Sequence, residues 1–529
     1  MFWFIPAWYA GNEWKENEQA WYVPRRQSEV DDTVKQIQLF DRKSDIEQTT
    51  ILLSHAPNYR HFLHRQGLLH SNYWSCFDAI QEIKMKRPGI LSFHNLVWPD
   101  GIEFVYSPFA VIAFLQGQKF AQMEFSEDGN MFLLDMYRED QMFRRNIYDD
   151  RGFLSVTAVY RDGQMAYEQY LNVSGVWKIC RYADGHVEVN PKENHYLLQY
   201  GGREETRVYQ RLVYENLESL IREVFTAYVA HISPEDIFCI AAHPLHSALL
   251  GEVLKDRRKI ISFFNERCRL QENQAARNLA MDSDAVVVNS RDVIRQARLD
   301  EVRQEKYTTV ITPFDSRMDF GRSLQLKEQH ILVAVDGLSD AVFEKLTIAL
   351  MSYLKTNEMA RVDLFTRQAG YNIENHFLGK TAAVLKKYGY NPDYARVTGK
   401  NQAENVLEEQ VPVLFFVRKC VDEMSVNRCL QEQRVVIDVS DVSDLFLQIS
   451  ALSMGIPQIV KHTSEYVQDG GNGRRLTDIG SLKGILSYYL DTLKHWNEAN
   501  IAAYELGKKY TSENLVTLWR EVIAYVSQS

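Results

Sequence analysis

Short apolar runs alternate with helical stripes along the first part of this chain, a pattern typical of an α/β protein. Phe2–Ile5 predicts a buried strand, and Thr50–Ser54 predicts the next strand. Between them, the Asp31–Asp32 pair predicts the start of a helix, because short acidic residues cap helix N-termini. A helix is predicted at Tyr59–Leu63 and another at Tyr73–Ile83. Strand, helix and strand in this order favour a parallel α/β layer.

Between Trp98 and Pro191 the pattern changes to short runs separated by turn residues. The turn signals are Pro99-Asp100-Gly101, Asp128-Gly129-Asn130, Asp150-Arg151-Gly152, Asp162-Gly163, Ser174-Gly175 and Asp184-Gly185. An Asp-Gly step between alternating apolar runs is a strong local hairpin signal. We therefore predict an antiparallel β-meander inserted into the first α/β domain.

Helices and strands alternate again after the meander. Four buried strands are predicted at Ile237–Ala241, Ile260–Phe264, Ala285–Asn289 and Thr309–Ile311. After Pro313 a second α/β series begins, with a helix that Ser339 caps and that runs to Leu354. Its strands are predicted at Ile331–Val335, Val362–Phe365, Val413–Val417 and Val435–Asp438. The predicted fold is therefore two Rossmann-like domains, 1–95 plus 207–320 and 321–500, with the meander at 96–206 and terminal helices at 501–529.

Composition narrows the classes of function. A chain of 529 residues is too long for one hydrophobic core. A net charge of −10 argues against a nucleic-acid partner, which needs a basic face. The six cysteines form no C-x-x-C pair, so we expect a reducing compartment. The histidine pairs, at positions 61 and 64 and at 243 and 246, lack further ligands at metal spacing, so we expect neither metal nor cofactor.

The N-terminus contains Pro6 and has no basic leader, so it is not expected to be a signal peptide. Apolar runs stay well short of the roughly 20 residues that a membrane-spanning helix needs. We expect a cytoplasmic chain whose contact with a membrane, where it occurs, is peripheral.

The segment Val435–Leu476 contains a strand, a helix that stops at Gly455-Ile456-Pro457, a second strand and the turn Asp469–Gly473. This order resembles the retaining glycosyltransferases of the GT-B fold. In that family two glutamates handle the donor sugar and the ribose, and the matching positions here are Val442 and Ser450. Neither residue carries a carboxylate. The resemblance therefore implies that the sugar-transfer chemistry of the family has been lost in this chain.

The same resemblance places the phosphate-binding Arg and Lys of the family at Gly337 and Val342. A leaving diphosphate needs fixed positive charge, which neither residue supplies. Asp336 and Asp340 would instead repel it. An alignment shifted by a few residues would let Lys345 serve, and that alternative stays open.

Three separated segments make the resemblance more specific. They are the opening MFWFIPAWY, the stretch YRHFLHRQGLL at Tyr59–Leu69 and the segment Val435–Leu476, which lacks the two glutamates of the family's donor site. Together they resemble the accessory Sec glycosyltransferases and, more closely, the family of the first accessory secretory protein of the accessory Sec system. The resemblance implies a complex with other accessory secretory proteins, which assists the accessory Sec motor ATPase in exporting a glycosylated serine-rich repeat adhesin. It also implies terminal helices that cross back to the first domain.

Candidate ligand residues follow the predicted strands, because ligands bind beyond the carboxyl ends of strands in open α/β sheets. These candidates for a glycan cleft are Trp8, Tyr9, His243, Asn265, Glu266, Arg267 and Arg474. The turn Asp469–Gly473 is expected to be a tight surface turn rather than an anion cradle.

The leading hypothesis is a catalytically inactive, glycan-recognising export subunit. One alternative is an active glycosyltransferase that takes a carboxylate from Glu465 or Glu266. The other is a scaffold whose cleft is vestigial.

Overall fold

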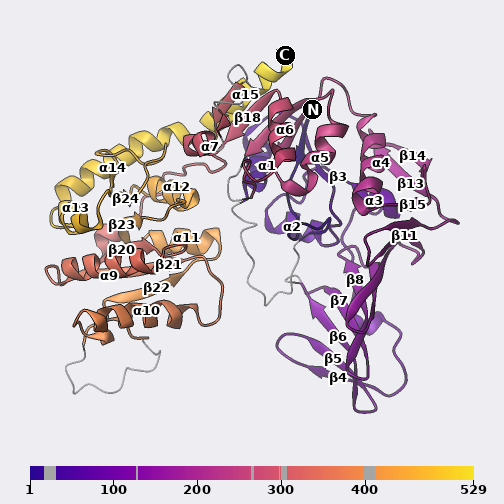
Figure 1. Cartoon of the computed structure of the whole chain (residues 1–529), viewed down its shortest axis with the longest axis horizontal. Helices are drawn as coiled ribbons and strands as arrows, with labels where there is room; N and C mark the ends of the chain where they lie inside the picture. Colours follow the sequence, from indigo (N-terminus) through magenta and orange to yellow (C-terminus); the bar gives the residue numbers. More distant parts are fainter. Residues whose placement is uncertain are drawn as a thin grey trace.

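The computed structural model describes residues 1–16, 31–126, 129–263, 267–296, 298–299, 307–397 and 411–528. Figure 1 shows two α/β lobes, with the C-terminal helices passing from one lobe to the other and a long antiparallel sheet extending from the first lobe.

The first lobe is built on a parallel sheet of seven strands in the order β19-β18-β17-β16-β1-β2-β3. The strands are β1 (Phe2–Ile5), β2 (Gln48–Leu52), β3 (Tyr73–Ser75), β16 (Ile237–Ala241), β17 (Arg258–Phe263), β18 (Ala285–Val288) and β19 (Tyr307–Val310). The helices of this lobe are α1 (Asp32–Lys43), α2 (Tyr59–Arg65), α3 (Cys76–Gln81), α4 (Leu217–Val229), α5 (Pro244–Val253), α6 (Gln274–Asp282) and α7 (Arg291–Gln296).

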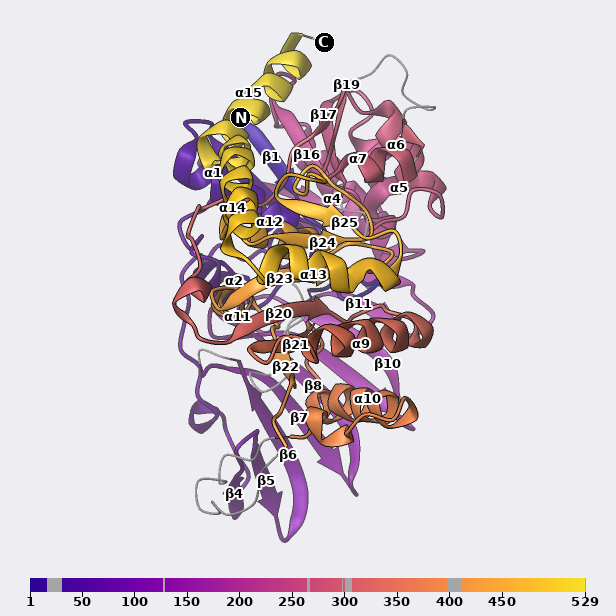
Figure 2. The same cartoon turned by 90° about the vertical axis from the view of Figure 1, so that its left-hand side faces the viewer.

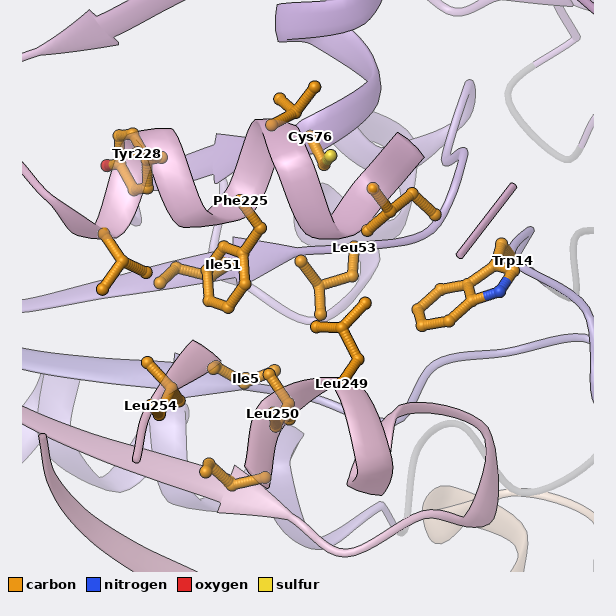
Figure 3. Packing of buried hydrophobic residues seen from close by; sticks show 14 of the residues in the cluster. Ile5, Trp14, Ile51, Leu53, Cys76, Phe225, Tyr228, Leu249, Leu250 and Leu254 are labelled. Atoms are coloured by element: carbon orange, nitrogen blue, oxygen red, sulfur yellow. The ribbon is translucent and has the colours of Figure 1, made fainter. Parts of the chain in front are cut away.

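Both faces of this sheet are buried, so successive residues of a strand join different cores. In β1, Trp3 and Ile5 pack with α4 and α5, whereas Phe2 and Phe4 pack with α1 and the C-terminal helix. Figure 3 shows the first of these cores, where Ile5 and Ile51 lie among side chains from α4 and α5. Continuous apolar strands are expected where helices cover both faces of a parallel sheet.

The antiparallel sheet has ten strands in the order β15-β12-β11-β10-β9-β8-β7-β6-β5-β4. They are β4 (Ile102–Tyr106), β5 (Val111–Leu115), β6 (Gln118–Phe125), β7 (Met131–Arg138), β8 (Gln141–Asp149), β9 (Phe153–Arg161), β10 (Gln164–Leu171), β11 (Trp177–Tyr182), β12 (Val187–Val189) and β15 (Val213–Tyr214). A separate hairpin consists of β13 (His195–Tyr200) and β14 (Arg203–Val208). The last strand, β15, lies beyond residue 206, where the sequence places the end of the insertion.

Buried ion pairs join this sheet to the first lobe. Arg60 of α2 donates Nε–H to Asp150 Oδ1 at 2.5 Å and lies 3.0 Å from Asp149 Oδ1 through Nη2. Arg151 contacts Asp78 of α3 at 2.8 Å. Removing one partner of such a buried pair is strongly destabilising, because the other charge is left without compensation.

The second lobe is built on a parallel sheet of six strands in the order β22-β21-β20-β23-β24-β25. They are β20 (Gln329–Ala334), β21 (Ala360–Thr366), β22 (Phe415–Lys419), β23 (Gln433–Asp438), β24 (Gln458–Val460) and β25 (Gly473–Arg475). The helices are α9 (Asp340–Leu354), α10 (Ile373–Lys387), α11 (Glu423–Leu430), α12 (Leu445–Ser453), α13 (Leu482–Leu490) and α14 (Leu493–Gly507). Figure 2 shows α9 and α10 on the outer side of this lobe.

The last helix, α15 (Ser512–Gln528), packs on the first lobe. Trp519 is fully buried there, with its ring 5.7 Å from that of Phe40 and 6.2 Å from that of Phe2. The two ends of the chain therefore share one core. None of the helices in the described part of the chain is long and apolar enough to cross a bilayer.

The prediction of a single helix over Tyr73–Ile83 is wrong at its start. Tyr73–Ser75 forms β3, which pairs in parallel with β2. The two aromatic residues suit an edge of the sheet, where Trp74 stacks on Tyr228 with ring centroids 3.9 Å apart. The helix begins only after Ser75, whose side chain accepts a hydrogen bond from the backbone N–H of Asp78.

Candidate functional site in the cleft between the lobes

A cleft of about 740 Å³ lies between the two lobes. The first lobe contributes residues that follow β18, among them Asn289, Ser290 and Asp292. The second lobe contributes the loops that follow β20, β21 and β23. The carboxyl ends of strands from both sheets therefore meet here, where open α/β sheets bind ligands.

Asp336 and Gly337 form the loop after β20. Asp336 accepts hydrogen bonds from Thr366 Oγ1 at 2.7 Å and from the backbone N–H of Arg367 at 2.7 Å. Gly337 has φ of +73°, which a residue with a side chain adopts only at a cost. A carboxylate and a bare backbone thus occupy the place where the resemblance puts a phosphate-binding arginine.

Asp438, at the end of β23, shapes the next loop. Its Oδ1 accepts the backbone N–H of Ser440 at 3.1 Å and its Oδ2 accepts that of Asp444 at 3.0 Å. Burial raises the pKa of this carboxyl, and the neighbouring Asp444 raises it further. Asp444 in turn caps α12, since its Oδ1 accepts the N–H of Leu447 at 2.9 Å.

Arg367 lines the cleft, and its side chain is already paired. Its Nε–H donates to Asp444 Oδ2 at 2.5 Å, and its guanidinium carbon lies 5.2 Å from the ring centre of Phe446. The lining residues include five aspartates (Asp292, Asp336, Asp438, Asp441 and Asp444) against two arginines (Arg269 and Arg367). A cleft lined by more carboxylates than cations repels the negative charges of a polyphosphate.

The four positions that the resemblance assigns to the donor site lie apart in the structure. Gly337 and Val442 line the cleft, and Val442 is 55% exposed. Ser450 is buried in α12 and lines a separate small pocket of about 90 Å³. Val342 packs in α9 against the second-lobe core, and the alternative Lys345 is exposed on the same helix, so neither lines the large cleft.

The first-lobe candidates form a packed polar network instead of a free surface. Trp8 Nε1 donates to Asp31 Oδ1 at 2.9 Å, and the Tyr9 hydroxyl lies 2.8 Å from His246 Nδ1. Arg267 is paired with Asp32 through Nη2 and Oδ2 at 3.0 Å. Trp8, Tyr9 and Arg267 therefore do not line the large cleft.

Burial determines the titration of this network. Desolvation raises the pKa of Asp31 to about 6, and the neighbouring Asp32 adds to the effect. His243 accepts the N–H of Leu245 at 3.1 Å as the cap of α5, and burial lowers its pKa to about 4. His243 also lies outside the lining of the cleft.

The remaining candidates lie elsewhere. Asn265 and Glu266 fall outside the described residues. Arg474 in β25 lies 4.8 Å above the ring of Tyr488 and does not line the cleft. Five further residues line the cleft and were not predicted from the sequence: Asn289, Arg367, Asp438, Asp441 and Asp444. Asn289 and Asp438 end predicted strands, and the other three lie in the segments that follow predicted strands, which was the available signal.

The turn Asp469–Gly473 uses its own N–H groups. Gly470 N–H donates to Gly473 O at 2.9 Å, and Gly471 N–H donates to Gln468 O at 3.0 Å. Gln468 N–H is held by Asn472 Oδ1 at 2.8 Å. These donors are therefore occupied and do not cradle an anion. This agrees with the expectation of a tight surface turn.

An active glycosyltransferase was hypothesised to use the carboxylate of Glu465 or Glu266, of which only Glu465 lies within the described residues. Glu465 connects the two lobes. Its Oε1 accepts the backbone N–H of Arg291 at 3.0 Å, and the Arg291 side chain lies 3.6 Å away. Glu465 does not line the cleft, although its neighbour Ser464 does.

Two facing α/β lobes, an inserted meander and a cleft at the strand ends define a protein of the GT-B glycosyltransferase fold. The structure is similar to that of the pneumococcal O-GlcNAc transferase GtfA, with a TM-score of 0.66 at 11% identity over 100% of this chain and 99% of that one. This likeness concerns the fold alone and confirms the predicted fold class.

Within that class the chain belongs to the family of accessory secretory protein 1 of the accessory Sec system, whose model matches residues 1–525. It is 32% identical to the accessory Sec system protein of this name from Streptococcus gordonii, over 98% of both chains. It is also similar to a chain in the crystal structure of accessory secretory proteins 1, 2 and 3 in Streptococcus pneumoniae, with a TM-score of 0.80 at 28% identity over 100% of both chains. These matches confirm the family resemblance stated above.

Proposed function

We propose that this chain is a non-catalytic, glycosyltransferase-like subunit of the accessory Sec export system. Its cleft would hold the sugars of a glycosylated serine-rich repeat adhesin. The observation that carries the proposal is the pairing of Arg367 with Asp444 in a cleft rich in carboxylates. A nucleotide-sugar brings a diphosphate, and a diphosphate needs cations that are free to meet it.

A neutral sugar fits the same lining better. Sugar hydroxyls donate hydrogen bonds, and carboxylates such as Asp336 and Asp441 accept them. Phe314, Phe365 and Phe446 line the cleft as well and offer apolar faces for sugar C–H groups. Such a mixture of aromatic faces and a few fixed polar groups is typical of small-ligand sites.

Asn289 is the first-lobe residue best placed to bind such a ligand. It is 6% exposed and lines the cleft, and within the described part of the chain its Oδ1 has no hydrogen-bond partner. A buried acceptor without a donor costs free energy, which a ligand hydroxyl or amide N–H would recover.

The proposal of a non-catalytic role is supported by what the nearby carboxylates do. Val442 and Ser450 stand at the positions of the family's glutamates. Glu465 is held by Arg291 and lies outside the cleft lining. Asp438 and Asp444 are used to shape the loop and to cap α12.

The proposed partners follow from the family. Because the similar pneumococcal chain comes from a structure of accessory secretory proteins 1, 2 and 3, we propose that this chain assembles with the corresponding proteins. We further propose that it serves the accessory Sec motor ATPase in the cytoplasm, with peripheral contact at the inner face of the membrane.

Calorimetry on the full chain tests the proposal. A serine-rich peptide carrying O-linked GlcNAc should bind, whereas the bare peptide should not. UDP-GlcNAc should give no binding heat up to about 1 mM, a limit of about −4 kcal/mol in binding free energy. Micromolar binding of UDP-GlcNAc would contradict the proposal that the cleft no longer binds a diphosphate, and it would favour an active transferase.

Matched variants locate the site. Asn289→Ala should weaken glycopeptide binding about tenfold, since one hydrogen bond of a buried acceptor is worth about 1–2 kcal/mol. Asn278→Ala, on the exposed side of α6 and away from the cleft, should leave binding unchanged. Equal affinities for glycosylated and bare peptide would leave the scaffold role as the better account.

A further inference from the structure

Three side chains of the kinds that bind metals meet where the hairpin β13–β14 packs on the first lobe. Glu82 follows α3, Glu193 lies in the turn before β13, and His195 is the first residue of β13. Ligand atoms of the three side chains all lie within 4.8 Å of one another. Within the described part of the chain, no other three His, Cys, Asp or Glu side chains form such a group.

The separations between these atoms fit one small cation. His195 Nε2 lies 3.0 Å from Glu82 Oε1 and 3.8 Å from Glu193 Oε2. Zinc lies about 2.1 Å from a carboxylate oxygen or an imidazole nitrogen, so two ligand atoms of a tetrahedral site are about 3.4 Å apart. The two distances fall on either side of this value, so small movements of the side chains bring the atoms within bonding distance of one ion.

A buried lysine orients the two carboxylates. Lys178 of β11 is 0% exposed and donates to Glu82 Oε2 at 3.0 Å and to Glu193 Oε2 at 3.3 Å. In metal sites, hydrogen-bond partners of this kind hold the ligating carboxylates in position. Two carboxylates against one ammonium leave one net negative charge, which attracts a divalent cation.

Pairing with Lys178 explains only part of the group. A buried ammonium needs carboxylate partners, and the Oε2 atoms of Glu82 and Glu193 supply them. The imidazole of His195 lies instead beside the other oxygen of Glu82, Oε1. This nitrogen and this oxygen are therefore available to a second cation.

The three side chains are held in place and are open to solvent. Phe77 of α3 and Leu198 of β13 pack in one apolar core, and Figure 1 shows the helix beside the hairpin. Ligands carried by packed elements keep the geometry that a metal site needs. The side chains of Glu82, Glu193 and His195 are between 19% and 33% exposed, so an ion and a water molecule reach them.

We propose that Glu82, Glu193 and His195 form a zinc-binding site that ties α3 to the hairpin. Each carboxylate supplies one oxygen, His195 supplies Nε2, and a water molecule completes the tetrahedron. Magnesium and calcium prefer six or more oxygen ligands, so this set favours zinc. The expectation of no metal rested on histidine pairs close in the sequence, whereas Glu82 joins this set only through the fold.

Zinc titration of the full chain, first freed of metal with a chelator, tests this proposal independently of the glycan proposal. We expect calorimetry to show one zinc ion per chain with a micromolar dissociation constant, and zinc to raise the melting temperature more than magnesium does. His195→Ala removes one ligand and leaves Lys178 both of its carboxylate partners, so the variant should fold. It should bind zinc at least about tenfold more weakly, since losing even a partner that only orients a ligand costs that much.

His186→Ala is the matched control. His186 also contacts two carboxylates, those of Asp184 and Glu188, but these three side chains do not form a group with ligand atoms close enough for one ion. The control should bind zinc as the parent chain does. Absence of binding heat with zinc, full affinity in His195→Ala, or an equal loss in both histidine variants would overturn the proposal.

Discussion

The hydroxyl of Tyr466 in the second lobe donates a 2.6 Å hydrogen bond to the backbone carbonyl oxygen of Asn289 in the first lobe. Tyr466 is 1% exposed, so this bond is shielded from water. The side chain of the same Asn289 lines the cleft. The contact that joins the lobes and the proposed ligand site therefore share one residue.

Removing this hydroxyl should weaken the contact between the lobes. We expect Tyr466→Phe to lower the free energy of unfolding by about 1–2 kcal/mol, because the buried carbonyl oxygen loses its donor. Denaturant unfolding followed by tryptophan fluorescence measures the change. Tyr371→Phe is the matched control, since Tyr371 is 99% exposed and its loss of a hydroxyl should have no effect.

Releasing Arg367 should restore some affinity for phosphate. Asp444→Asn keeps an oxygen that caps α12 but removes the charge that neutralises Arg367. We expect UDP to bind this variant about tenfold more tightly than the parent, a gain of about 1.4 kcal/mol. Titration of UDP in low salt measures it, with Asp393→Asn, at an exposed residue that does not line the cleft, as the control. An unchanged affinity would show that the pairing with Asp444 does not set the exclusion of phosphate.

Gly455 ends α12 in a crowded place. Its φ is +70°, and a Cβ there would lie 2.1 Å from Asn500 Nδ2 and 2.9 Å from Phe320 Cδ1. We expect Gly455→Ala to cost at least about 3 kcal/mol in unfolding free energy, from backbone strain plus displacement of these side chains.

Gly470 provides the comparison, since its φ is +77° and a Cβ there meets no atom within 4 Å. Gly470→Ala should cost only the strain, about 1–2 kcal/mol. Equal losses in the two variants would mean that the neighbours of Gly455 move aside freely.

Buried histidines should make the chain sensitive to acid. Burial lowers the pKa of His55 to about 4 and that of His246 to about 3, from an ordinary value near 6.5. Because the folded pKa is depressed, the unfolded chain binds the proton first as the pH falls below 6.5. Stability that is complete above pH 6.5 is then lost progressively toward pH 4, by on the order of 3 kcal/mol for His55.

Thermal unfolding between pH 7.5 and pH 4.5 measures this loss. His55→Gln, which can still reach Ser155, the present partner of His55 Nε2 at 2.8 Å, should flatten the profile. A profile that keeps its full slope in this variant would assign the acid sensitivity to other groups.

Local patterns in the sequence predicted the order of elements well. The strands Phe2–Ile5 and Ile237–Ala241 and the helix that Ser339 caps have the bounds expected for them. Period and capping chemistry act within a few residues, so a sequence records them directly. The edge strand Tyr73–Ser75 was missed because three residues are too few to show a period.

The candidate site was predicted less well. Trp8, Tyr9 and Arg267 do follow strands, but Asp31, Asp32 and His246 occupy their polar groups. A strand-end position shows that a residue is near the edge of a sheet, and it does not show which neighbours already bind it. Arg367 was overlooked because it follows β21, whereas the family's phosphate-binding Arg and Lys follow the first strand of the second domain.

The sequence by itself determined the alternation of strands and helices, the meander and the absence of carboxylates at Val442 and Ser450. Only the tertiary structure decided which charged side chains form ion pairs with one another. Arg367 and Asp444 are 77 positions apart and meet because β21 and β23 lie on either side of β20. Electrostatic interactions depend on distance in space, which local periodicity does not encode, so the character of the cleft emerges only when the sheets are assembled.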